Sequence, residues 1–181
     1  MNMLKESPEA KQKAKQIKAI IFDVDGVLTD SGIWFDRHSN EFKRFNAKDG
    51  FIVKPLQKYG FIVGAITGKD SDTTMYRCNE LGLDFHYHGP KDKAVNYHQA
   101  KEKFKLTDEQ VCYIGDDIQD LSILGRCGLS ACPLDARMYI QDRVDLVTRT
   151  RGGQGVLRDV ADFVLQEQGL FDKLLQTYLS R

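Results

Sequence analysis

The chain has 181 residues, of which 26 are basic and 26 are acidic, so its formal net charge is zero. This balance provides no overall attraction to nucleic acid or to an anionic membrane, and we expect neither as a partner. The hydrophobic fraction of 41% is typical of a globular protein, and no apolar run approaches the roughly 20 residues of a membrane span.

Residues 1–16 are highly charged and lack the apolar segment of a secretory signal. We expect them to form a polar tail or a short surface helix, followed by a single domain over residues 17–181. The four cysteines form no CxxC pair, which favours free thiols that pack as small hydrophobic groups over metal ligands or disulfides. Free thiols of this kind are typical of a reducing cytoplasm, where we expect the protein to be located.

Short apolar runs alternate with segments of helical pattern along the chain. The predicted strands are Lys18–Phe22, Phe61–Ile66, Phe85–Tyr87, Val111–Ile114, Leu129–Ala131 and Leu146–Val147. The predicted helices lie near Ser71–Leu81, Asp92–Phe104, Ile118–Arg126 and Ala136–Gln141. This alternation predicts an α/β fold in which helices cover both faces of a doubly wound, mostly parallel sheet.

The segment GIWFDRHSNEFKRF, residues 32–45, departs from this alternation. Two apolar segments flank a turn-forming stretch, a pattern that predicts a β-hairpin and not a crossover helix. Its aromatic side chains, including the only tryptophan, Trp34, are too many for a free flap. They would pack either on their own domain or on another subunit, and we favour another subunit. The next helix is ambiguous: Asp49 can cap it, but Pro55 would then lie inside it, so it starts near Lys54 or kinks there.

A glycine loop and a final helical region are predicted over residues 152–181. The loop has the sequence RGGQG, and the apolar residues Val156, Leu157, Val160 and Val164 follow it at helical spacing.

Polar side chains stand where the predicted strands end. In chain order they are Asp23 and Asp25, then Thr67-Gly68-Lys69, then Lys93 on the following crossover, then Asp116 and Asp117 with Asp120. The carboxyl ends of parallel strands meet at one edge of a sheet, so we expect these groups to line one crevice. An Asp at a strand end also often caps the next helix, but this set in this order favours a site.

Several carboxylates in one crevice repel one another unless a cation lies between them. Mg²⁺ prefers oxygen ligands, uses few protein carboxylates and keeps positions for water and substrate phosphate, so we expect Mg²⁺ here. A bound cation also keeps a carboxylate ionised and therefore nucleophilic.

The segments DVDGVLTD, ITGK and GDDIQD, with Lys93 between the last two, resemble the four motifs of the haloacid dehalogenase superfamily of phosphohydrolases. Within this superfamily, FNAKDG, YRCNELG and the GGQG segment followed by Arg158-Asp159 are similar to the 3-deoxy-D-manno-octulosonate 8-phosphate (KDO 8-phosphate) phosphatases. The resemblance runs from about residue 17 to residue 168. Only about 40 residues separate Asp25 from Thr67, so no large cap domain fits between them.

The resemblance implies a role for each motif residue. Asp23 would attack phosphorus to form an aspartyl-phosphate, and Asp25 would act as general acid and then as general base. The implied Mg²⁺ ligands are Asp23, the backbone carbonyl of Asp25, and Asp116. Asp117 would orient Lys93 or a metal-bound water.

The remaining motif residues would contact the phosphoryl group. Thr67 would offer its hydroxyl and Gly68 its backbone N–H to the phosphoryl oxygens, while Lys93 would neutralise developing charge.

The resemblance also implies a substrate and an assembly. The positions that line the sugar acid in the family are here Asn46, Lys48, Asp49, Gly50, Lys54, Lys69 and Arg77. Lys54 and Lys69 stand where well-known members have arginine, and Gln154 replaces an arginine in the glycine loop, so a nonulosonate 9-phosphate is the alternative substrate. The family implies a homotetramer in which the hairpins meet and each site is partly covered by a neighbour.

Two other classes of protein are compatible with parts of the pattern. A receiver domain also combines an acidic Mg²⁺ pocket with a phosphorylated Asp, but that Asp belongs on the third strand, where FHYHG supplies none. A non-catalytic assembly protein that keeps the fold is disfavoured because every motif residue is present.

Overall fold

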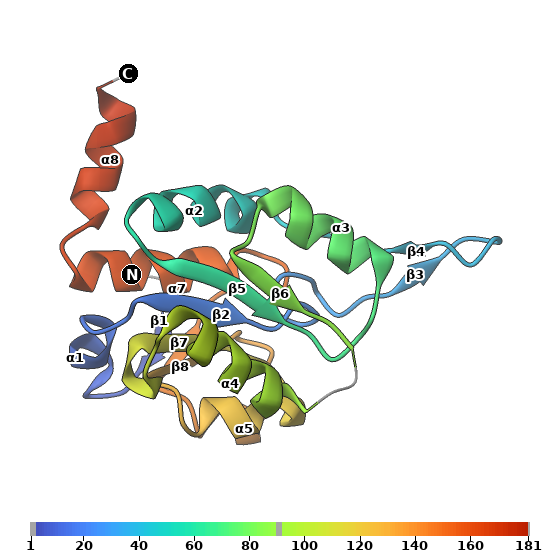
Figure 1. Ribbon diagram of the computed structural model, residues 1–181, viewed down its shortest axis with the longest axis horizontal. Helices are drawn as coiled ribbons and strands as arrows, with labels where there is room; N and C mark the ends of the chain where they lie inside the picture. The colour runs from blue at the N-terminus through green and yellow to red at the C-terminus, as the bar shows by residue number, and fades with distance from the viewer. Residues whose placement is uncertain (1–2, 90–91, 181) are drawn as a thin grey trace.

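The computed structural model describes residues 3–89 and 92–180, and a seven-stranded sheet lies at its centre (Figure 1). The strands of the described chain follow the order β1-β9-β8-β7-β2-β5-β6, and each neighbouring pair is parallel except β1 and β9. Their bounds are Met3–Glu6 (β1), Ala19–Phe22 (β2), Ile62–Ile66 (β5), Phe85–Tyr87 (β6), Val111–Ile114 (β7), Leu129–Cys132 (β8) and Leu146–Thr148 (β9). The predicted α/β fold with a mostly parallel sheet is confirmed.

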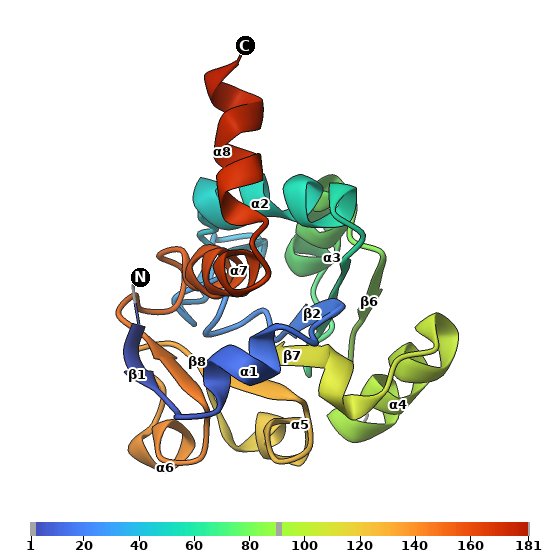
Figure 2. The same cartoon turned by 90° about the vertical axis from the view of Figure 1, so that its left-hand side faces the viewer.

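Helices cover both faces of this sheet (Figure 2). One layer holds α1 (Ala10–Ala14), α2 (Ala47–Lys58), α3 (Asp72–Leu81) and α7 (Val156–Glu167), and the other holds α4 (Lys93–Phe104), α5 (Leu121–Leu124) and α6 (Met138–Gln141). Short 3₁₀ helices, η1 (Asp108–Gln110) and η2 (Ile118–Asp120), flank β7, and α8 (Phe171–Leu179) projects from the body. Ile20 and Phe22 of β2 pack toward the first layer and Ile21 toward the second, because successive strand side chains point to opposite faces.

The predicted hairpin is confirmed as a two-stranded sheet of β3 (Trp34–Phe35) and β4 (Glu41–Phe42) that extends away from the body (Figure 1). Its aromatic side chains are open to solvent in the isolated chain: Trp34 is 69% exposed, Phe35 63% and Phe42 55%. An apolar surface of this kind is typical of a contact with another molecule.

The prediction of a polar tail before residue 17 is wrong for the described part of that segment. Met3–Glu6 forms an edge strand that pairs with β9, and Met3 is buried. Helix α1 matches the predicted short helix, but it is not confined to the surface, because Ala10 and Ala14 are fully buried. The abundant lysines concealed this pattern, since only a few small or apolar side chains in the segment face inward.

Helix α2 begins earlier than predicted. Asn46 is its N-cap, and its side-chain Oδ1 accepts a hydrogen bond from the backbone N–H of Lys48, so Asp49 lies inside the first turn. Pro55 lies within the helix, which continues to Lys58. No helix in the described residues is both long enough and apolar enough to cross a membrane.

Candidate active site

The crevice lies at the end of β2, the strand between the two halves of the sheet. Phe22 is paired in register with Ala65 of β5 and with Ile114 of β7, so the residues after these strands reach the same edge. This is the point where the strand order reverses, at which open α/β sheets bind their ligands. A cavity of about 270 Å³ opens there, lined by Asp23, Asp25, Ser31, Thr67, Gly68, Lys69, Asp116, Asp117 and Gln119.

A second cavity of about 330 Å³ shares Ser31, Asp116 and Asp117 with the first. Its further lining includes the exposed cation Arg137 and the backbone of Gly152 in the glycine loop. The two cavities are therefore adjacent. One can hold the reacting group of a ligand, and the other can hold the rest of the same ligand.

Asp23 and Lys93 form a buried ion pair at the bottom of the crevice. Lys93 Nζ lies 2.8 Å from Asp23 Oδ2 and 2.8 Å from Asp120 Oδ1. The other oxygen of Asp23 accepts a hydrogen bond from the N–H of Val24 at 2.7 Å. Burial lowers the pKa of Lys93, but the attraction of Asp23 and Asp120 raises it more, so the amine is a fixed cation.

The carboxylates of this crevice lie close enough to need a cation. Burial and repulsion from Asp120 raise the pKa of Asp23 to about 7, and burial and repulsion from Asp23 raise that of Asp116 to about 8. Carboxylate oxygens of Asp23, Asp116 and Asp120 all lie within 4.8 Å of one another. A hard divalent cation therefore fits this oxygen-rich donor set.

Gly26 allows the chain to pass close to Asp116. Its φ of +93° is in a region that L-residues rarely adopt, and a Cβ at this position would collide with the carboxylate of Asp116. The glycine after the DxD pair is therefore required both by the turn and by the space next to the acidic group.

Asp120, and not Asp117, is the residue that orients Lys93. Besides binding Lys93, Asp120 Oδ1 accepts from the hydroxyl of Tyr113 at 2.7 Å, while Oδ2 accepts from the N–H groups of Asp116 and Asp117. Of the two predicted roles of Asp117, the contact with Lys93 is therefore not observed, and the orientation of a metal-bound water stays a prediction. Asp117 instead lines the cavity and accepts a hydrogen bond from the Tyr139 hydroxyl at 3.0 Å.

Lys43 contacts Asp25, and no sequence motif predicted this contact. Its Nζ lies 2.8 Å from Asp25 Oδ2, 3.1 Å from Thr74 Oγ1 and 3.5 Å from Glu41 Oε1. The side chain of Lys43 is fully shielded from solvent, although it follows the hairpin strand β4. Its position in a charged segment, KRFNAK, gave no signal that this particular lysine turns inward.

Thr67 and Gly68 follow β5 at the wall of the same cavity. Thr67 is buried, and its backbone N–H donates to the carbonyl of Tyr87 in β6, which fixes the chain at this point. A Cβ at Gly68 would meet the amide oxygen of Gln119, so glycine leaves the space open. These placements are compatible with the predicted contacts to phosphoryl oxygens.

The predicted sugar-binding residues do not gather in this crevice within one chain. Lys69 lines it and forms an ion pair with Glu41. Arg77 lies in a separate surface hollow beside Lys43 and Phe45, and Lys54 lines another one near α8. The glycine-loop carbonyl of Gly153 accepts from the side chain of Asn46.

The remaining three positions lie in the first turn of α2. Asp49 is buried and accepts a hydrogen bond from the N–H of Arg158 at the start of α7, Lys48 is exposed, and Gly50 lies against the Arg77 guanidinium. A sugar acid bound by all seven positions would therefore have to bridge surfaces that one chain does not bring together.

No protein-family model matches the chain, but comparisons with individual proteins do. The 3-deoxy-D-manno-octulosonate 8-phosphate phosphatase KdsC of Yersinia pestis is 37% identical over 163 residues, which cover 90% of this chain and 86% of the relative. KdsC of Escherichia coli (strain K12) is 36% identical over 161 residues, or 89% of this chain and 86% of the relative.

Solved structures agree with these relatives. A haloacid dehalogenase superfamily (subfamily III A) hydrolase, described as putative, from Legionella pneumophila superposes with a TM-score of 0.90 at 35% identity, covering 96% of this chain and 95% of that one. The KDO 8-phosphate phosphatase of Moraxella catarrhalis, crystallised with magnesium, phosphate and KDO, gives a TM-score of 0.90 at 32% identity and covers 94% of this chain and 98% of that one.

The fold and the acidic crevice thus define a phosphatase of the haloacid dehalogenase superfamily. Asp23 after the central strand, Thr67 after β5 and Lys93 beside Asp23 occupy the places that its motifs predict. Within the superfamily, the chain belongs to the 3-deoxy-D-manno-octulosonate 8-phosphate phosphatase family, because the identity to its curated members extends along most of both sequences.

Proposed function

We propose that this chain hydrolyses KDO 8-phosphate to KDO and phosphate, with Mg²⁺ as cofactor and Asp23 as nucleophile. The observation that carries the proposal is the Asp23 carboxylate, held at 2.8 Å by Lys93 in a crevice that it shares with Asp116. The Moraxella catarrhalis relative, whose crystals hold a magnesium ion, a phosphate ion and KDO together, supports the same chemistry.

In the first half-reaction, an Asp23 carboxylate oxygen forms a bond to phosphorus as the bond from phosphorus to the sugar oxygen breaks. Asp25, which lines the same cavity, donates its proton to the departing alkoxide. Lys93 stays charged beside Asp23 and stabilises the negative charge that spreads over the phosphoryl oxygens.

In the second half-reaction, Asp25 accepts a proton from water, whose oxygen attacks phosphorus and releases the Asp23 carboxylate with free phosphate. Thr67 and Gly68 orient the phosphoryl oxygens in both halves. Mg²⁺, held by Asp23, the carbonyl of Asp25 and Asp116, would offset the charge of the carboxylates and the phosphate.

Three of the cations predicted to bind the sugar acid, Lys48, Lys54 and Arg77, do not line the crevice of their own chain. The exposed hairpin aromatics and the separate location of Arg77 support a homotetramer in which the hairpins meet and a neighbouring chain covers each site. In this assembly, the α2–α3 surface of one chain faces the substrate that is bound in the crevice of the next.

A related nonulosonate 9-phosphate is the second candidate substrate. Lys69 lines the crevice where arginine is typical of the family, and it is already paired with Glu41. A lysine ammonium cannot form the paired hydrogen bonds to a carboxylate that an arginine guanidinium forms. The length of the sugar acid is therefore the property that distinguishes the two candidate substrates.

A substrate panel tests both candidates. Phosphate release is measured with Mg²⁺ on KDO 8-phosphate, a nonulosonate 9-phosphate and simple hexose phosphates, and the highest kcat/KM is expected for KDO 8-phosphate. A preference for the nine-carbon compound would select the second candidate. Stoichiometric labelling by acetyl phosphate without turnover would instead indicate a receiver-like protein, and neither labelling nor turnover would indicate a non-catalytic one.

The nucleophile is tested by Asp23→Asn, with Asp142→Asn at an exposed position as the matched control. We expect a loss of at least about 1,000-fold in kcat for the first variant, because an amide does not replace a carboxylate nucleophile. Near-normal phosphate release by Asp23→Asn, with the control unchanged, would refute the covalent route.

A further inference from the structure

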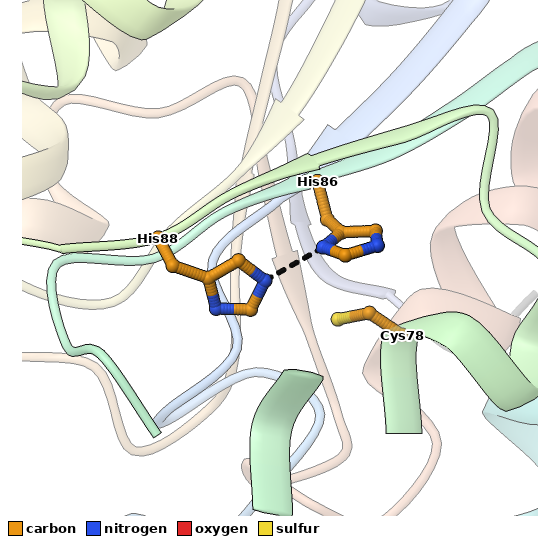
Figure 3. Close-up of side chains that lie close together, drawn as sticks. All are labelled: Cys78, His86 and His88. Atoms are coloured by element: carbon orange, nitrogen blue, oxygen red, sulfur yellow. Dashed lines mark hydrogen bonds between the residues drawn. The ribbon is translucent and has the colours of Figure 1, made fainter. Parts of the chain in front are cut away.

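Three side chains that commonly bind transition metals converge outside the acidic crevice. They are Cys78 on α3, His86 on β6 and His88 just after β6, and a ligand atom from each lies within 4.8 Å of the other two. Figure 3 shows the sulfur of Cys78 pointing toward both imidazole rings. None of the three lines either of the two cavities of the candidate active site.

The local structure explains how these residues meet. His86 and His88 are two positions apart on an extended segment, so their side chains lie on the same face of the sheet edge. Cys78 faces inward from α3 and is buried, while both histidines are half-buried. Burial alone would explain the thiol, but it does not explain two imidazoles next to it.

The two rings are in direct contact. His86 Nδ1 lies 2.7 Å from His88 Nε2, and the rings meet edge to face. On its other side, His86 Nε2 donates a hydrogen bond to the side-chain oxygen of Asn79 at 3.1 Å. That hydrogen bond places the proton of His86 on Nε2 and leaves a lone pair on Nδ1. In metal-bound histidines, a hydrogen-bond acceptor next to the ring fixes the proton in the same way.

His88 can present a lone pair to the same point. Without a metal, His88 Nε2 donates to the lone pair on His86 Nδ1, and the Nδ1 of His88 has no hydrogen-bond partner among the described residues. When the proton moves to Nδ1, Nε2 becomes a donor atom for a metal without a change in the charge of the ring. Burial lowers the pKa of both histidines, which favours the neutral form of each ring.

We propose that Cys78, His86 and His88 bind one Zn²⁺ ion, with water as the fourth ligand. One thiolate and two imidazoles form a donor set that suits zinc and not Mg²⁺, which prefers the carboxylates of the crevice. Zinc needs bonds of about 2.3 Å to sulfur and about 2.0 to 2.1 Å to nitrogen, so the rings must separate slightly as they bind. The Cys78 thiol loses one proton to solvent when the Zn–S bond forms.

Zinc at this place would tie α3 to the edge of the sheet. Among the described strands, β6 is the last of the sheet and pairs only with β5. Helix α3 also carries Thr74, one turn before Cys78, and Thr74 accepts a hydrogen bond from Lys43. The zinc site therefore supports an element next to the acidic crevice, but it does not depend on the proposed substrate.

Cobalt provides a spectroscopic test that separates the two metal sites. The chain is stripped with a chelator and titrated with Co²⁺ in excess Mg²⁺, and a sulfur-to-cobalt charge-transfer band with intense visible absorption is expected at one equivalent. An all-oxygen site gives no such band. The band should persist in the Asp23→Asn/Asp116→Asn double variant, whose acidic crevice is disabled, and in Cys127→Ser, which removes a half-buried thiol elsewhere.

Zinc affinity is then measured by competition with a chromophoric chelator. We expect Cys78→Ser and His86→Gln each to weaken zinc binding by at least about 100-fold and to lose the cobalt band, while Cys127→Ser matches wild type. If Cys78→Ser does not fold, as judged by far-UV circular dichroism, the half-buried His86→Gln variant decides the result. Equal zinc affinity in wild type and His86→Gln, or the absence of a sulfur-to-cobalt band in wild type, would overturn the proposal.

Discussion

Lys43 is a residue whose importance comes entirely from its contacts. Its ammonium group, shielded from solvent, holds Asp25 Oδ2 at 2.8 Å and anchors to Thr74. We propose that this positions Asp25 for proton transfer. Lys43→Met removes the contact, and we expect kcat to fall by about 10- to 100-fold while KM changes little, since Lys43 is expected to act through Asp25. Steady-state kinetics across a pH range measure the effect.

The exposed Lys103→Met variant on α4 is the matched control for Lys43. Lys43→Arg keeps the positive charge and should recover part of the lost kcat, which a purely structural role would not require. If Lys43→Met raised KM at unchanged kcat, Lys43 would instead contribute to substrate binding.

Asp49 couples the stability of the fold to pH. Burial, with added repulsion from Asp159, raises its pKa to about 7 from the usual 3.8. The folded state therefore holds the proton more tightly than the unfolded state, and the free energy of unfolding falls as pH rises from about 4 to about 7. The shift corresponds to on the order of 4 kcal/mol.

Asp49→Asn should remove this pH dependence. The amide oxygen can still accept from the Arg158 N–H but never ionises, so the variant should be more stable than wild type at pH 8 and similar at pH 4. Urea unfolding at a series of pH values measures the difference, with the exposed Asp172→Asn as control. Parallel pH profiles for wild type and Asp49→Asn would show that Asp49 does not titrate in this range.

The motifs at the strand ends predict the acidic crevice, because the parallel register of the strands places Asp23, Thr67 and Asp116 at one edge of the sheet. The contacts of Lys43 and the Cys78–His86–His88 cluster could not be predicted, because strand register does not determine them. Each depends on a side-chain direction or a contact between elements, and neither is encoded by spacing along the sequence.

At the scale of elements, β1 shows that a charged segment can complete a sheet. It pairs with β9, buries Met3 and is held by the guanidinium of Arg149, which donates to the Met3 carbonyl at 3.1 Å. Removal of residues 1–8 exposes the edge of β9 and the site of the Met3 side chain. We expect the free energy of unfolding to fall by roughly 2 kcal/mol or more, as measured by urea denaturation.

The catalytic crevice should be unaffected by this truncation, because β1 and β2 are separated by three strands. Normal kcat/KM below the unfolding transition is therefore the internal control. If the truncated chain were as stable as wild type, the pairing of β1 would contribute nothing to stability, and residues 1–8 would behave in solution as a free tail.

The other elements show where periodicity is informative. The apolar runs of β2, β5 and β7 are buried on both faces, so they predict central parallel strands directly. The start of α2 was missed because Asn46 and Asp49 are both plausible caps, and only the extended backbone of Asn46 distinguishes them. Short edge elements such as β1 bury too few side chains to produce a pattern.

At the scale of the molecule, the hairpin is an element whose aromatic side chains remain exposed in a single chain. The hairpin of β3 and β4 extends from the body, and burying its exposed Trp34, Phe35 and Phe42 against other copies supplies apolar contact area for the proposed tetramer. Trp34→Ser/Phe42→Ser should therefore give monomers or dimers by sedimentation equilibrium, with kcat/KM for the sugar acid phosphate reduced more than that for a small phosphate ester. The exposed pair Met138→Ser/Leu179→Ser is the control. A hairpin variant that remains tetrameric would show that the aromatic surface serves another contact.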